Sequence, residues 1–265
     1  MPNQAFDRAA ALADMSRLLA ACYYEPSPEF NEERLFDAMI DAAQRVEAPL
    51  AEKASLLKTA FEADSQQDLL VDYAHLFLGP VGLLALPYES AWLEKQGVPS
   101  ADATQALLDL FADGGFEVDP EFHDLPDHIA VELEFLYTTF FRTAAALRDG
   151  DQPAINELTD LWQRLIDLHL GRWFPDFHVA VNAGAQCRFY RELADLTAQF
   201  IAVARHEGRR GHQAQRVEIA LDRNEALHRL AREGEYVLYV SSFEVRKNHR
   251  LLLQIWKDLY RERGE

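Results

Sequence analysis

The stretch HDLPDHIAVELEFLYTTFFRTAAALRDG, residues 123–150, carries the clearest signal of fold in this 265-residue chain. Its apolar side chains recur every three or four residues, which is the spacing of one face of an α-helix. They are Ile129, Leu133, Leu136 and Phe140. We expect Asp124 to cap this helix, with Pro126 in the first turn and Asp127 near the positive end of the dipole. The stretch therefore predicts one long amphipathic helix that ends at Gly150.

The same spacing predicts helices over most of the chain up to residue 206. The expected ranges are 8–22, 31–46, 50–63, 68–79, 100–113, 152–171 and 185–206. Between the last two, residues 169–177 (HLGRWFPDF) predict an aromatic-rich corner, which is more typical of a core than of a binding site. No clear run of β-branched residues occurs in this part, so the expected fold is all-α, a single multi-helix bundle.

The last part of the chain differs in composition. Residues 1–208 hold 14 Lys and Arg against 35 Asp and Glu, whereas residues 209–265 hold 12 against 9. Residues 208–213 (GRRGHQ) have the composition of a linker. Residues 235–245 favour either a strand or a buried helical turn, and the sequence around them favours helix. We therefore expect an all-helical domain over residues 1–208 and a basic, mostly helical extension over residues 209–265.

Composition excludes several classes of protein. A net charge of −18 argues against nonspecific nucleic-acid binding, although an acidic body can attract a basic partner. No apolar run is long enough to span a membrane, and charged residues such as Asp7 and Arg8 interrupt any signal-peptide core. These features predict a cytoplasmic protein without stable membrane insertion. Cys22 and Cys187 lack a metal-binding spacing and are expected to be buried thiols.

Residues 76–97, LFLGPVGLLALPYESAWLEKQG, are unusually apolar for a segment that glycine and proline interrupt. The GPVG element lacks the lysine and hydroxyl residue of a phosphate loop, and charged residues that follow at once argue against a membrane hairpin. Loops are seldom so apolar, because their backbone groups need partners. We expect a concave recognition surface with Tyr88 and Glu89 as its polar groups. Alternatively, Glu89 and Ser90 merely cap the next helix.

His128 and Glu132 stand four residues apart, beside the apolar stripe of the predicted long helix. One interpretation is metal ligation by these two residues, although no HExxH motif and no third ligand are evident. A second is a polar, partly acidic rim of Asp127, His128 and Glu132 that binds a cationic peptide, a guanidinium group above all. A third is a solvated first helical turn with no such role.

The adjacent pair His123-Asp124 supports an enzymatic alternative. Such a pair in an all-helical protein is typical of metal-dependent phosphohydrolases of the HD type. Those enzymes need a further histidine and a distant aspartate, for which only His75 and Asp167 can be nominated. This hypothesis would also use His128.

Four elements together resemble the redox-enzyme maturation chaperones of the TorD, DmsD and NarJ type. They are YAHLFLGP, PYESAWL, PDHIAVELEFL and HLGRWFPDF followed by FYRELADLTAQF, in the family's order between about residues 8 and 206. The resemblance implies an all-helical fold without catalytic residues, metal or cofactor. It also implies binding of the N-terminal leader, often a twin-arginine leader, of a molybdopterin oxidoreductase whose apo form is held in the cytoplasm until its cofactor is inserted.

When the family's site residues are transferred by motif, the resemblance implies a leader-binding surface of six residues. The spacing of His128 and Glu132 adds Glu132 to them. The six are Tyr73, Phe77, Tyr88, Glu89, Asp127 and His128. Two features depart from the family pattern. The chain reads Leu86-Pro87-Tyr88 where the family usually has a second proline or a tryptophan, which leaves the client open. The extension 209–265 lies outside the pattern, and a homodimer contact is one of its possible roles. GTP binding is not carried over, because no phosphate motif is present.

Overall fold

The computed structural model describes residues 2–78, 84–98, 100–117 and 124–215. In these ranges every regular element is a helix, which confirms the predicted all-α class. In chain order the elements are α1 (Pro2–Cys22), α2 (Glu29–Glu32), α3 (Leu35–Val46), α4 (Ala48–Ala63), α5 (Gln66–Tyr73), the π-helix η1 (Ala74–Leu78), α6 (Glu89–Lys95), α7 (Ser100–Asp113), α8 (Ile129–Asp149), α9 (Gln152–Arg164), the π-helix η2 (Leu165–Leu170), α10 (Gly171–Gly184) and α11 (Arg188–Gln215).

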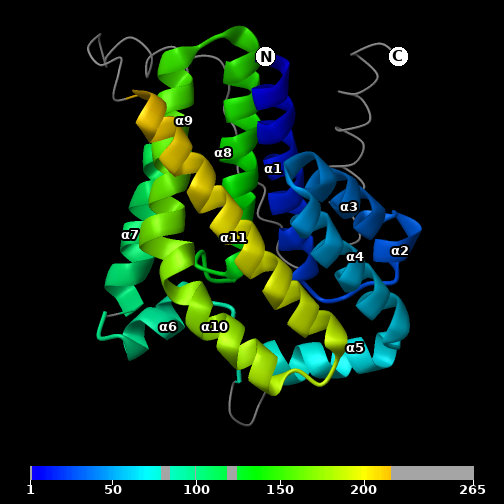
Figure 1. The fold of residues 1–265 in the computed structure, drawn as a ribbon. Helices are drawn as coiled ribbons and strands as arrows, with labels where there is room; N and C mark the ends of the chain where they lie inside the picture. The colour runs from blue at the N-terminus through cyan, green and yellow to red at the C-terminus, as the bar shows by residue number, and fades with distance from the viewer. Residues whose placement is uncertain (1, 79–83, 99, 118–123, 216–265) are drawn as a thin grey trace.

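The centre of the bundle is the antiparallel pair of α1 and α8 (Figure 1). On α8 the predicted apolar stripe is buried, with Leu133 and Leu136 at 0% exposure. On α1 the facing side is rich in alanine around Met15, which is also fully buried. Small side chains let two helices approach closely, so this seam buries much apolar surface per residue. Helix α3 packs beside α1, α4 packs on α3 and α11, and α9 packs on α8. Helix α11 crosses the front of the bundle (Figure 1).

Several predicted helix ends are wrong. Helix α8 begins at Ile129, and its cap is His128, whose Nδ1 accepts a hydrogen bond from the Ala130 amide at 3.1 Å. Asp124, Pro126 and Asp127 therefore precede the helix and do not form its first turn. Its other end is as predicted, because Gly150 adopts a φ of 71° there.

The expected helix over 31–46 is also divided. Arg34 adopts a φ of 55°, in the left-handed region, and separates α2 from α3. This conformation is unfavourable for a residue with a Cβ atom, and the spacing of apolar residues does not reveal it.

The predicted corner at residues 169–177 is helical. The chain continues from α9 through η2 into α10, and Pro175 lies inside α10 shortly after the π-helix. Gly171 makes this passage possible, because a Cβ atom at that position would overlap the Ile166 carbonyl oxygen and the Arg205 guanidinium. The aromatic side chains Trp173, Phe174 and Phe177 are buried, so their assignment to the core is confirmed.

Helix α11 runs to Gln215 and so passes through residues 208–213, which had the composition of a linker. The boundary between domain and extension stays a prediction, and the expected elements beyond residue 215 lie outside the described residues. Both cysteines are buried as expected, and desolvation raises the pKa of the Cys187 thiol to about 12. Within the described ranges, none of the helices combines the length and the apolar character that crossing a bilayer requires.

Candidate functional site

The PYES and PDH elements meet, although about 40 residues separate them in the sequence. The amide of Ile129 donates to the Pro87 carbonyl at 2.8 Å, and the amide of Glu89 donates to the Asp127 carbonyl at 3.0 Å. Tyr88 and His128 thus form an isolated antiparallel bridge. The two segments therefore lie side by side. We call this place the junction, and define it as residues 87–90 together with residues 124–129.

Asp127 joins the two segments further. Its Oδ2 atom accepts a hydrogen bond from the Ser90 amide at 2.8 Å, in the first turn of α6. A carboxylate at this end of a helix satisfies a backbone donor that has no partner within the helix. Asp127 thus caps α6, although α8 follows it closely in the chain. The cap of α8 is His128 instead.

The seven residues predicted for peptide binding lie at or near the junction, but six of them are buried. These are Tyr73, Phe77, Glu89, Asp127, His128 and Glu132. Glu89, Asp127 and Glu132 have 0% exposure, so they do not form the solvent-facing acidic rim that the sequence suggested. The alternative of a solvated first turn is wrong for the same reason. Tyr88 is only half-buried and keeps part of its ring accessible.

A buried polar network lies beneath the junction. The Nδ1 atom of His169 lies 3.0 and 3.1 Å from the two carboxylate oxygens of Glu89. The indole of Trp173 donates to Oε1 of Glu132 at 2.9 Å. Burial raises the pKa of Glu132 well above its ordinary value, and the nearby Glu89 carboxyl adds to this effect. Desolvation also raises the pKa of Glu89, against which His169 favours the charged form.

Aromatic rings surround His128 on both sides. Tyr24 stacks on the imidazole at 5.9 Å between centroids, and Tyr88 meets it edge-on at 5.3 Å. Burial lowers the pKa of His128 to about 4, so the ring is neutral at neutral pH. The hydroxyl of Tyr88 donates to Oδ1 of Asp124 at 2.9 Å, and that of Tyr24 donates to Glu134 at 3.1 Å.

Tyr24 is a site residue that sequence reasoning missed. Its only signal was its place two residues after the end of the predicted helix over 8–22. Nothing in that position indicates a partner on α8, because the pairing depends on how α1 and α8 pack.

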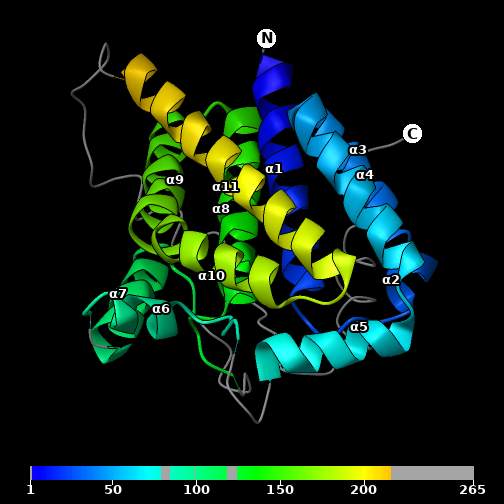
Figure 2. The same ribbon diagram turned by 60° about the horizontal axis from the view of Figure 1, so that its bottom comes forward.

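Exposed apolar side chains flank the junction. Leu84 precedes Tyr88 by four residues and is 40% exposed, and Leu125 follows Asp124 and is 51% exposed. Leu78 at the end of η1 is 56% exposed. The end of η1, the start of α6 and the start of α8 gather at the same end of the bundle (Figure 2). The intervening residues 79–83, which belong to the expected apolar recognition surface, lie outside the described residues.

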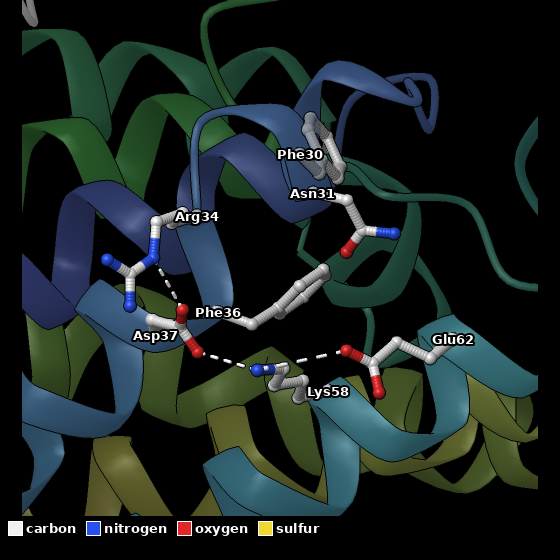
Figure 3. Close-up of a pocket in the computed structure, with 7 residues that line it drawn as sticks. All are labelled: Phe30, Asn31, Arg34, Phe36, Asp37, Lys58 and Glu62. Atoms are coloured by element: carbon white, nitrogen blue, oxygen red, sulfur yellow. Dashed lines mark hydrogen bonds and ion pairs between the residues drawn. The ribbon is translucent and has the colours of Figure 1, made fainter.

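A cavity of about 140 Å³ lies elsewhere, between the α2–α3 region and α4 (Figure 3). Its lining is Phe30, Asn31, Arg34, Phe36, Asp37, Lys58 and Glu62. The charged groups there engage one another, since Lys58 contacts Asp37 at 2.6 Å and Glu62 at 3.8 Å. None of the seven predicted site residues lines this cavity.

The residues nominated for a phosphohydrolase have other partners. His123 lies outside the described residues. Asp124 accepts from Tyr88, Asp167 accepts from Arg205 at 2.9 Å, and His75 lies 3.8 Å from Asp72. In the part of the chain that the structure describes, no group of three or more His, Cys, Asp or Glu side chains is placed to hold a metal ion.

Comparison with known families identifies the chain. The model of the family described as "Nitrate reductase delta subunit" matches residues 43–179, just over half of the chain. The chain belongs to the nitrate reductase delta subunit family. This confirms the resemblance that the four sequence elements indicated, and the match covers the residues on both sides of the junction.

Relatives of this family member include proteins named as chaperones. "Chaperone protein TorD" of Aliivibrio salmonicida is 28% identical over 138 residues, which are 52% of this chain and 63% of that protein. The TorD of Vibrio parahaemolyticus is 29% identical over 52% of this chain and 62% of that protein. "Tat proofreading chaperone DmsD" of Salmonella typhi is 27% identical over 189 residues, which are 71% of this chain and 85% of that protein. The chain thus spans less than two thirds of the length of these two TorD proteins.

Proposed function

We propose that this protein is a cytoplasmic chaperone, without catalytic turnover, for a molybdopterin oxidoreductase. It binds the N-terminal leader of the apo enzyme subunit and holds the client until the cofactor is inserted. The names of the TorD and DmsD relatives support the chaperone role. The observation that carries the proposal is the junction, where a half-buried tyrosine and an exposed aspartate lie on segments that also carry exposed leucines.

The recognition chemistry follows from a leader that carries arginines followed by an apolar stretch. Its guanidinium group bonds to the Asp124 carboxylate and stacks on the Tyr88 ring. The apolar stretch packs against Leu78, Leu84 and Leu125, which are exposed in the free protein. The acidic body speeds the encounter with a basic leader.

The buried residues of the predicted site act beneath this surface. Tyr73 and Phe77 stack edge-on at 5.3 Å and form part of its floor. Asp127 and His128 fix the two backbone segments to each other. Leader binding thus depends on these residues through the shape they maintain, and Tyr88 makes the direct contact.

The affinity expected from this surface is moderate. Burying ~400 Å² of apolar surface contributes roughly 10 kcal/mol. A leader that is disordered when free loses much of this gain on ordering and on association. We expect dissociation constants in the micromolar to submicromolar range, and weaker binding at high salt because the charge attraction is screened.

Isothermal titration of a synthetic leader peptide into the full chain tests the proposal. Tyr88→Ala and Asp124→Asn are each expected to weaken binding about tenfold, since each removes one partner of the guanidinium group. Asp113→Asn is the matched control, because Asp113 is an exposed aspartate that pairs with Arg164 at 2.8 Å away from the junction. Wild-type affinity in both junction variants would refute the site. Whether the protein is a homodimer stays a separate prediction, which its mass in solution tests.

A further inference from the structure

Two buried residues, to which the motif resemblance assigned no role, contact carboxyl groups in or next to the junction. His169 on η2 and Trp173 on α10 stand four residues apart and are both buried, at 6% and 0% exposure. His169 contacts both carboxylate oxygens of Glu89, and Trp173 donates to Glu132. Each of the two carboxyls therefore has a partner on the η2–α10 segment.

One of the two carboxyls lies in the junction, and the other follows its second segment by three residues. Glu89 directly follows Tyr88, and its own amide bonds the Asp127 carbonyl. Glu132 lies in the first turn of α8, and its amide donates to the His128 carbonyl at 3.2 Å. A side chain that holds Glu89 thus holds the start of α6, and one that holds Glu132 holds the start of α8. Together they set how Tyr88 and His128 face each other.

The π-helix supplies the geometry for both contacts. It adds a residue to the turn between α9 and α10, and such wide turns occur often at functional sites. Gly171 leaves room for the Ile166 carbonyl within that turn. This backbone conformation requires a glycine at position 171. The same conformation sets the positions of His169 and Trp173.

The network also places several ionisable groups close together, away from bulk solvent. Glu89 faces Asp127 from the loop before α8, Glu132 from α8, His169 from η2 and Arg172 from α10. The Oδ1 atom of Asp127 and the Oε2 atom of Glu132 are buried and have no hydrogen-bond partner. The charge of the Glu89–His169 pair therefore acts on the junction at short range.

We propose that His169 and Trp173 are positioning residues of the leader site, acting through Glu89 and Glu132. They hold the two segments of the junction in the geometry in which Tyr88 and Asp124 receive the leader. The inference rests on the proposed function, because it concerns the same site. It adds that leader affinity depends on the charged form of Glu89, which His169 favours, so that acidification weakens binding as Glu89 takes up a proton.

The experiment compares full-length wild type with His169→Leu, His169→Gln and Trp173→Phe. Leader-peptide affinity is measured by titration at several values between about pH 5 and about pH 8, which lie above the ordinary pKa of a glutamate and so report a raised one. His169→Leu should bind roughly tenfold more weakly at neutral pH and lose most of the acid dependence, since a charge-assisted bond is removed. His169→Gln keeps a donor and should recover part of the affinity but none of the acid dependence. Trp173→Phe should bind about threefold more weakly.

A second measurement tests the positioning role of His169 on the protein alone, without the leader. Amide hydrogen exchange of Glu89 and Ile129, the two donors across the junction, should be about tenfold faster in His169→Leu than in wild type. If wild type does not bind the leader, the proposed function fails and the inference fails with it. If wild type binds and folded His169→Leu and Trp173→Phe match its affinity at every pH, the inference alone is overturned. Loss of affinity with an unchanged pH profile would also overturn it.

Discussion

The α1–α8 seam and the polar network beneath the junction are both buried, yet they are built from different chemistry. Along the seam, Leu133 and Leu136 pack among alanines, and their burial follows the spacing of apolar residues. Beneath the junction, Glu89 and Glu132 are equally buried, but each depends on a hydrogen bond from another element. The burial of these leucines therefore stabilises the fold whatever the pH, whereas the stability and shape of the junction depend on protonation and on specific partners.

The largest expected effect falls on the seam. Leu136→Ala leaves a cavity where no water can compensate, and should lower the free energy of unfolding by about 3 kcal/mol. Because no titratable group is involved, the loss should be the same at acidic and at mildly alkaline pH. Urea unfolding followed by circular dichroism measures it. A loss below about 1 kcal/mol would show that the seam is not the main apolar core.

The next largest loss of stability is expected at Gly171, where the chain passes from the π-helix η2 into α10. Gly171→Ala places a Cβ atom against the Ile166 carbonyl, so the π-helix must shift. We expect a loss of about 2 kcal/mol in unfolding free energy, as in other overpacked sites. Thermal unfolding of this variant beside wild type gives the value. Wild-type stability would mean that the π-helix is easily rearranged and fixes nothing above it.

Asp127→Asn removes a negative charge from the junction, keeps the size of the side chain and leaves the seam unchanged. The amide keeps an oxygen that can accept from Ser90 but loses the negative charge that strengthens the bond. The expected loss in unfolding free energy is about 1–2 kcal/mol, and leader binding should weaken with it. Asp113→Asn, an exposed change on another helix, is the control in the same urea titration. Equal stability of both variants would contradict the role of Asp127 as the cap of α6.

The last expected effect is a pH dependence of the unfolding free energy. Desolvation raises the pKa of Glu134, which accepts from Tyr24, to about 8. The folded protein thus binds a proton that the unfolded chain releases above its ordinary pKa, so this group reduces stability as pH rises toward about 8. Glu134→Gln should therefore gain stability relative to wild type between about pH 5 and about pH 8. A constant difference across that range would show that Glu134 is ionised in the folded state.

Much of the bundle can be predicted from the sequence, because apolar spacing reports which face of a helix is buried. The ranges of α1, α4 and α7 and the buried stripe of α8 follow from that rule alone. The rule does not report backbone conformation. It misses the left-handed Arg34 and reads the π-helix before Gly171 as the end of a helix.

The surroundings of the candidate site residues could not be predicted from the sequence. Charged side chains are almost never fully buried without a partner, so Glu89 and Glu132 were expected at the surface. Their partners, His169 and Trp173, come from a segment that had been assigned to an aromatic corner. Asp124 was likewise expected as a helix cap, because aspartate is a common cap. In the structure its carboxylate accepts a hydrogen bond from the hydroxyl of Tyr88. Partners distant in sequence cannot be read from local spacing.

The central claim is that the leader binds over the junction and not at the cavity beside α4. A leader peptide with a photoreactive residue in its apolar stretch, crosslinked to the full chain and mapped by mass spectrometry, tests this directly. The account predicts crosslinks to residues 84–90 and 124–128 that excess unlabelled leader abolishes. Crosslinks concentrated on Arg34, Lys58 and their neighbours in the cavity would contradict it.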